Sequence, residues 1–165
     1  MFDQSLIFDG TLPSTGVAIT VTRVSTNVLD LLVARDLGAG DTLDINVRAM
    51  TTFTATTSAT LQVQFETCAT EGGSYVALAM SPIYPVAQLI AGSNLFAIVL
   101  PMNQLLNGTT GVLAVPGRFL RLTYTVATGP MTAGSVMAWL TATKDRNQYT
   151  TYPKNYTAAV AAGQI

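Results

Sequence analysis

Two segments of the chain alternate apolar and polar residues with a strict period of two. They are residues 42–50, TLDINVRAM, and residues 59–67, ATLQVQFET. The apolar positions are Leu43, Ile45, Val47 and Ala49 in the first segment, and Leu61, Val63 and Phe65 in the second. Successive side chains of a β-strand point to opposite faces, so this pattern indicates strands with one buried face. Such strands have to pair and be covered, which restricts the chain to a sheet-based fold.

Further strands are predicted by the same reasoning. The alternation recurs in residues 118–126, RFLRLTYTV, and residues 135–143, SVMAWLTAT. Weaker patterns predict strands that start at Val17, Val28, Tyr75 and Leu95. Clusters of Gly, Pro, Asn and Asp separate these segments, as expected for tight turns. One helical turn is predicted over residues 85–92, because Pro stands at its start and Gly at its end.

The fold class follows from about eight short strands separated by turns. This arrangement predicts an all-β protein, an antiparallel β-sandwich of jelly-roll type. An immunoglobulin type is disfavoured because its sequence pattern has two cysteines flanking a Trp, and Cys68 is the only cysteine of this chain. At 165 residues the chain fits one domain. We expect an N-terminal arm over residues 1–16, the sandwich over residues 17–143 and a C-terminal tail over residues 144–165.

The chain is unusually poor in charge. Charged residues make up 10% of it, against about 25% in an average soluble domain, while hydrophobic residues reach 49%. A chain of this composition has to expose apolar and uncharged side chains, and such a surface is expected to contact other protein subunits. Eight basic and nine acidic residues are scattered along the chain, so nucleic acid is not an expected partner. The most apolar segment, residues 75–101, is broken by prolines and polar residues, so no membrane span or membrane partner is expected.

Candidate catalytic and metal-binding residues are few. The chain has no His, so the usual general base near neutral pH is missing, and no G-x-S-x-G motif is complete. Asp36, Asp41 and Asp44 do not have the spacing of a calcium loop, and we interpret them as turn and surface residues. Cys68 is expected to be a buried or nearly buried thiol. The sequence therefore predicts neither an enzyme nor a metal or cofactor site.

Arg35 and Asp36 stand between an apolar segment and the turn LGAGD. Because they are adjacent, their side chains would point apart on an extended chain, and each would need a different partner. Two interpretations remain open. The residues form ion pairs that fix the corner of the sandwich, or they contact a neighbouring subunit.

Four segments carry a resemblance to a known family. They are residues 25–43, STNVLDLLVARDLGAGDTL, residues 59–68, ATLQVQFETC, residues 117–145, GRFLRLTYTVATGPMTAGSVMAWLTATKD, and residues 148–153, QYTTYP. In this order the chain resembles the capsid cement (decoration) proteins of short-tailed bacteriophages, whose subunit is a jelly roll. The similarity extends over about residues 2–153. The long loop at residues 100–117, the turn ATEGGS and the extension beyond Pro153 depart from the family pattern.

The resemblance implies a virion structural protein, made in the host bacterial cytoplasm and placed on the outer surface of the icosahedral capsid. It would bind neighbouring major capsid protein subunits and stabilise the shell, as a homodimer or, alternatively, a trimer. We expect its contacts in segments that the core of a sandwich does not need. The candidate interface residues are Phe2, Leu6, Phe8, Arg35, Asp36, Leu105, Leu106, Tyr149, Tyr152 and Tyr156. For the three tail tyrosines, packing back on the sandwich is an open alternative.

A carbohydrate-binding module is the competing hypothesis. Jelly rolls often serve as lectins, and the strand RFLRL after a Pro-Gly turn resembles a recurring strand of galactose-binding-like domains. Sugar binding favours exposed aromatic platforms, yet the single Trp139 lies in the middle of a predicted strand.

Overall fold

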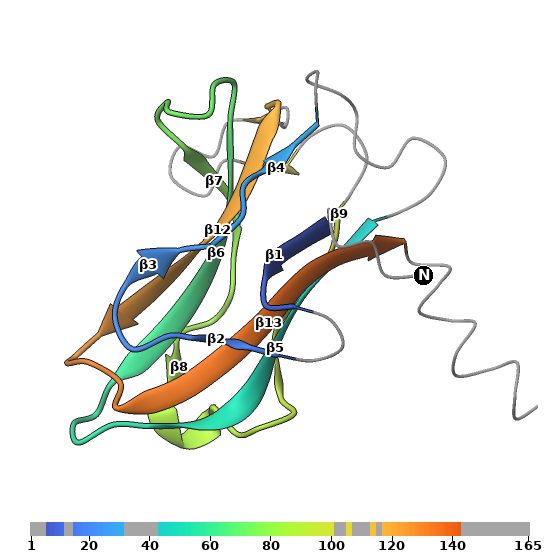
Figure 1. Ribbon diagram of the computed structural model, residues 1–165. Coiled ribbons are helices and arrows are strands. Elements are labelled where there is room, and N and C mark those ends of the chain that lie inside the picture. Colours follow the sequence, from blue (N-terminus) through green and yellow to red (C-terminus); the bar gives the residue numbers. More distant parts are fainter. Residues whose placement is uncertain are drawn as a thin grey trace, which may run out of the picture.

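The computed structural model describes residues 6–11, 15–31, 43–100, 105–106, 113–114 and 117–142. Two antiparallel sheets pack together, as Figure 1 shows. The first contains β1 (Ile7–Asp9), β2 (Val17–Ala18), β13 (Ala133–Ala142), β5 (Leu43–Thr54) and β9 (Asn94–Leu100). The second contains β3 (Arg23–Val24), β4 (Leu29–Asp30), β12 (Phe119–Ala127), β6 (Thr60–Cys68), β7 (Val76–Met80) and β8 (Tyr84–Pro85). A separate small pair is formed by β10 (Leu105–Leu106) and β11 (Leu113–Ala114).

Several of the short strands are halves of one interrupted strand. β1 and β2 both pair with β13, β3 and β4 both pair with β12, and β7 and β8 both pair with β6. With the halves combined, each sheet has four strands. In chain order the first sheet runs first, eighth, third, sixth, and the second runs second, seventh, fourth, fifth. This is the jelly-roll arrangement, so the predicted sandwich of about eight strands is confirmed.

The core lies between the two sheets and is built from the alternating positions of the four longest strands. Ile45, Val47, Leu61, Val63, Phe65, Leu120, Leu122, Tyr124 and Val136 are all 0% exposed. Burying a side chain of this size contributes on the order of 1.5–3 kcal/mol, so the alternation selects which face of each strand turns inward. The inward faces predicted from sequence are therefore confirmed.

The N-terminal part of the sandwich differs from the prediction. Residues 7–9, assigned to an arm, form β1, in which Ile7 pairs with Trp139 and Phe8 is fully buried in the core. The strand predicted to start at Val17 is also wrong as one element, because the chain leaves the first sheet after β2 and enters the second at β3. A strand of three residues is too short to show an alternating pattern. Where the chain crosses from one sheet to the other, each part of the strand is also too short to show it. At the other end β13 stops at Ala142, and the predicted tail, residues 144–165, lies outside the described residues.

The predicted helical turn is present in shortened form. A 3-10 helix, η2, spans Val86–Gln88, directly after Pro85. Gly92 follows with a φ of 90°, a left-handed conformation that glycine adopts without steric cost. The side chain of Leu89 between them is fully buried. The turn therefore closes one end of the sandwich and leads the chain into β9.

Candidate interaction surfaces

Only some of the predicted interface residues fall in the described part of the chain. Phe2, Arg35, Asp36, Tyr149, Tyr152 and Tyr156 lie outside the described residues, so their contacts stay predictions. Leu105 and Leu106 form β10 and pair with Leu113 and Ala114 of β11. Leu6 is partly buried against the core. Phe8 is 0% exposed, so its proposed role as an exposed contact is wrong: its ring fills the interior of the sandwich.

A buried polar network joins β1 of the first sheet to the second sheet. The carboxylate of Asp9 is 0% exposed. Its Oδ1 accepts hydrogen bonds from the backbone N of Thr26 at 2.9 Å, from Thr26 Oγ1 at 2.7 Å and from Arg23 Nη2 at 3.3 Å. Its Oδ2 accepts one from the Tyr124 hydroxyl at 2.8 Å. A buried charge is tolerated when it is paired and hydrogen-bonded in this way, so the network is structural.

Burial raises the pKa of Tyr124 well above 10.0, and the nearby negative charge of Asp9 adds to this effect. The hydroxyl therefore remains a proton donor to the carboxylate at ordinary pH. Tyr124 is itself 0% exposed. Because neither Asp9 nor Tyr124 can reach a solvent-borne substrate, the pair does not form an active site.

The outer face of the second sheet carries a second polar cluster. Glu66 Oε2 accepts hydrogen bonds from Arg121 Nε at 2.7 Å and from Thr123 Oγ1 at 2.8 Å. The guanidinium of Arg121 also lies 3.7 Å from the centre of the Tyr75 ring. These contacts explain why Glu66, an outward-facing residue of β6, is only 8% exposed. The negative charge of the Glu66 carboxylate is thus paired with the positive charge of Arg121 within the chain.

A bidentate ion pair occupies the same face, just before the first residue of β12. Arg118 Nε and Nη2 donate to the two carboxylate oxygens of Asp30, each at 2.6 Å. The bidentate hydrogen bond and the charge of Asp30 raise the pKa of Arg118, although desolvation opposes them. The outward positions between the two ion pairs and the far end of the sheet are Gln62, Gln64, Thr123 and Thr125. The face therefore offers hydroxyl and amide groups with little net charge.

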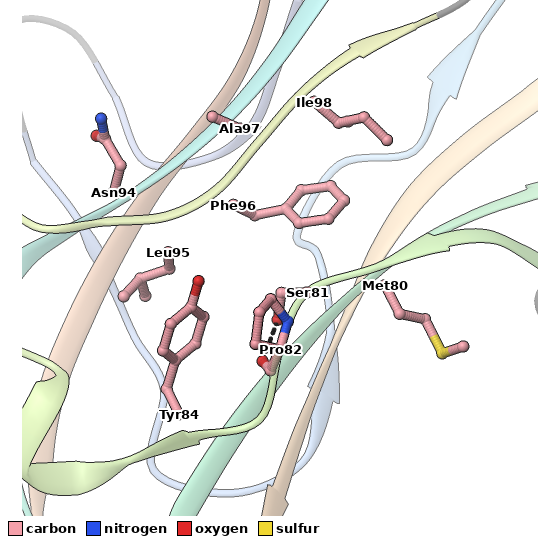
Figure 2. Close-up of a pocket in the computed structure, with 9 residues that line it drawn as sticks. All are labelled: Met80, Ser81, Pro82, Tyr84, Asn94, Leu95, Phe96, Ala97 and Ile98. Carbon is pink, nitrogen blue, oxygen red and sulfur yellow. Dashed lines mark hydrogen bonds between the residues drawn. The ribbon is translucent and has the colours of Figure 1, made fainter.

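One side of the sandwich is hollowed. It lies between β9, the edge strand of the first sheet, and β8 of the second sheet. A pocket of about 240 Å³ opens there between the two strands. Figure 2 shows the rings of Phe96 and Tyr84 lying between the strands, whereas Asn94 and Ala97 lie on the other side of β9. Leu95 and Phe96 are buried, so the floor of the pocket is mainly apolar. The hollow is small and open, and most of the residues that line it are apolar, with Ser81 and Asn94 as polar members.

Three exposed apolar side chains belong to the chain segments that line this pocket or precede them in sequence. Met80 lines it, Ile83 stands between Pro82 and Tyr84, which also line it, and Ile90 precedes β9. These three are 44%, 64% and 56% exposed. Sequence reasoning missed them because residues 75–101 were read only as strands and a turn. The available signal was Ile83 itself, a large apolar residue placed in a turn between two prolines.

The remaining candidates from the sequence have simple structural roles. Cys68, the last residue of β6, is a free buried thiol, as predicted. Trp139 is half-buried on the outer face of the first sheet, where it pairs with Ile7 and Asn46. Asp44, expected on the surface, is 1% exposed. Among the described residues no group of three His, Cys, Asp or Glu side chains could hold a metal ion.

In the described part of the chain, no helix has the length and apolar character needed to cross a membrane.

Comparison with known proteins gives one family. The family model described as Bbp16 matches residues 13–140, which are 128 of the 165 residues. The match begins before β2 and ends within β13, so it includes most of both sheets. A search of curated proteins found no match.

Proposed function

The chain belongs to the Bbp16 family, a phage-related family, and from this premise we propose that it is a capsid cement protein. In this role it binds the outer surface of an assembled icosahedral phage shell. It contacts neighbouring major capsid protein subunits and stabilises the shell without catalysing a reaction. The proposal joins the family membership to the resemblance carried by residues 25–43, 59–68 and 117–153.

The observation that carries the proposal is the outer face of the second sheet. Its described charged groups, Asp30, Glu66, Arg118 and Arg121, are paired with one another within the chain. What remains is a sheet surface of Thr and Gln side chains, with Val24 and Met80 exposed at its margins. Because these charges are already paired within the chain, a partner that covers the face meets few charged groups without a counter-ion, as at the centre of many protein interfaces. We propose that it rests on the shell.

The energetics of this role need only moderate affinity at each contact. A standard interface buries about 800 Å² per partner, which at about 25 cal/mol per Å² gives on the order of 20 kcal/mol before the costs of association. A subunit that touches two shell proteins gains further from effective concentration. Because it binds the assembled shell and not the dissociated subunits, it stabilises the shell by mass action.

Co-sedimentation with purified shells that lack the protein tests this function. We expect the unaltered protein to sediment with the shells and to raise the temperature at which they break open. If it stays in the supernatant at concentrations up to about 100 μM, where a Kd near 1 μM would give nearly full occupancy, the cement function is refuted.

Two matched variants test which face rests on the shell. Gln64→Lys places one charge at a half-buried, outward position in the middle of the second sheet, and Asn46→Lys does the same on the first sheet. We expect Gln64→Lys to weaken sedimentation at least tenfold and Asn46→Lys to leave it nearly unchanged. The opposite result would contradict the docking face while leaving the cement function standing.

A further inference from the structure

Arg48 differs from the other arginines in the described part of the chain. The others each form an ion pair with a carboxylate, in Arg23–Asp9, Arg118–Asp30 and Arg121–Glu66. Arg48 is exposed on the outer face of the first sheet, and within the described residues no carboxylate pairs with it. Asp44 is four residues away along β5, which is about 13 Å on an extended strand. The positive charge of Arg48 is therefore free to meet an anionic ligand.

The guanidinium of Arg48 is held in place by the turn that leads into β9. Its Nε donates to the carbonyl of Gly92 at 3.2 Å. The turn is itself tied to β5, because Gly92 N donates to Ala49 O at 2.7 Å and Ala49 N donates to Ser93 O at 2.9 Å. Within the described residues, Nη1 and Nη2 of Arg48 form no hydrogen bond. A ligand thus meets two donors that are already oriented, which lowers the entropic cost of binding.

Two neutral polar side chains follow Gly92 directly. Ser93 is half-buried and Asn94 is exposed, and Asn94 is the partner of Arg48 in the register of β5 and β9. Figure 2 shows that the Asn94 side chain does not lie between the sheets with Phe96. In the described part of the chain, neither the Ser93 hydroxyl nor the Asn94 amide has a hydrogen-bond partner. Both groups donate and accept hydrogen bonds, as the hydroxyls of a sugar do.

Apolar surface for a sugar ring is present on the same face. Ile90 is 56% exposed in the same turn, where its carbonyl accepts from Ser93 N at 3.0 Å. Trp139 is half-buried and is the diagonal neighbour of Arg48, because Arg48 pairs with Met137. Diagonal neighbours across antiparallel strands lie about 7–8 Å apart, within reach of an aromatic side chain. The face thus combines a cation, neutral polar groups and apolar side chains.

We propose that Arg48, Ser93 and Asn94 form a binding site for a carboxylated sugar, a uronic or sialic acid residue of an acidic polysaccharide. The carboxylate accepts two hydrogen bonds from the guanidinium, and the sugar hydroxyls bond to Ser93 and Asn94. We call these three residues the Arg48 site.

Charge and direction favour a sugar over a protein as the ligand. The centre of a protein interface is usually depleted of charge, whereas the Arg48 site has an unpaired charge at its centre. In the proposed function the second sheet rests on the shell, so the outer face of the first sheet is turned toward the medium. This step of the inference rests on the proposed function, but binding by the site is a property of the free protein.

Titration of the free protein with matched oligosaccharides tests the site. One pair ends in glucuronic acid or in glucose, and a second pair ends in sialic acid or in sialic acid whose carboxyl is reduced to an alcohol. We expect at least one carboxylated member to bind with a Kd below about 1 mM and its counterpart to bind at least tenfold more weakly. Backbone amide shifts of Gly92, Ser93 and Asn94 in NMR spectra report the binding. No binding up to about 10 mM, or equal binding of the counterpart or of acetate, overturns the proposal.

Variants of Arg48 test the role of its guanidinium. Arg48→Gln removes the charge, and Arg48→Lys keeps the charge but loses the planar pair of donors. We expect each to weaken binding of the carboxylated sugar at least tenfold. Arg118→Gln is the matched control, because it removes the same charge from the second sheet, and it should leave sugar binding unchanged. Unchanged affinity in Arg48→Gln or in Arg48→Lys contradicts the site.

Co-sedimentation with shells separates this inference from the proposed function. Arg48→Gln should sediment with shells as the unaltered protein does. If Arg48→Gln loses shell binding and the unaltered protein binds no carboxylated sugar, Arg48 is a shell contact and the sugar site is refuted. A protein that binds the sugar but not the shell keeps the Arg48 site and refutes the cement function.

Discussion

Removing the hydroxyl of Tyr124 tests whether the buried network holds the two sheets together. The hydroxyl donates a hydrogen bond of 2.8 Å to Oδ2 of Asp9, and the whole side chain of Asp9 is buried. A hydrogen bond to a charged group contributes about 1.5–3 kcal/mol, and Tyr124→Phe leaves that carboxylate oxygen without this donor. We therefore expect the free energy of unfolding to fall by about 2 kcal/mol. For a domain of this size that corresponds to a decrease in Tm of about 4–8 °C.

Urea unfolding measures this change through the midpoint, provided that the m-value stays constant. Tyr84→Phe is the matched control, because the Tyr84 hydroxyl lines the pocket and forms none of the hydrogen bonds described. We expect the control to change the free energy of unfolding by less than about 0.5 kcal/mol. If Tyr124→Phe also costs less than about 0.5 kcal/mol, the network does not stabilise the sandwich and the reasoning is refuted.

The same tyrosine predicts how stability depends on alkaline pH. Its pKa in the folded protein is raised above the ordinary value of 10.0, so the folded state holds the proton more tightly than the unfolded chain. The contribution is therefore fully present below about pH 10 and decreases as pH rises through the raised pKa. Tyr124→Phe should show a smaller loss of stability above pH 10 than the unaltered protein, measured by urea unfolding at several pH values.

Two further expectations concern the backbone and the shell contact. Gly134→Ala should lower the free energy of unfolding, measured by urea unfolding, by at least about 1–3 kcal/mol. Gly134 has a φ of 139°, where a side chain is strained by about that amount, and an added Cβ would also overlap the ring of Phe53. A loss below about 1 kcal/mol would show that the strand relaxes. Shell binding should change little between about pH 6 and 8, since the chain has no His, and little between low and moderate salt. Co-sedimentation across these conditions checks this, and a many-fold loss in salt would count against an uncharged docking face.

The sequence predicted those elements in which a local pattern repeats often enough to be read. β5, β6, β12 and β13 each have several alternating apolar positions, and their inward faces were identified correctly. β1 was missed because three residues cannot show an alternation. Its Phe8 was consequently taken for an exposed contact, although the ring lies in the core.

Properties that depend on residues far apart in the chain could not be predicted. The burial of Glu66 follows from Arg121, which is 55 positions later and becomes its neighbour only through strand pairing. The place of β9 at the edge of the first sheet is likewise a consequence of strand order, since the strand itself reads as an ordinary apolar strand. Arg35 and Asp36 lie outside the described residues, so both interpretations of this pair stay predictions.

The pairing of β1 with β13 affects the order in which the protein can be completed during synthesis. Trp139 follows its partner Ile7 by 132 residues, and Tyr124 follows its partner Asp9 by 115. At about 5–20 residues per second, a ribosome needs roughly 7 to 26 seconds to make the chain between Ile7 and Trp139. During that interval β1 lacks its partner strand β13, and for most of it Asp9 also lacks the Tyr124 hydroxyl from which it accepts a hydrogen bond. The first strand to leave the ribosome is thus among the last to be built into the sandwich.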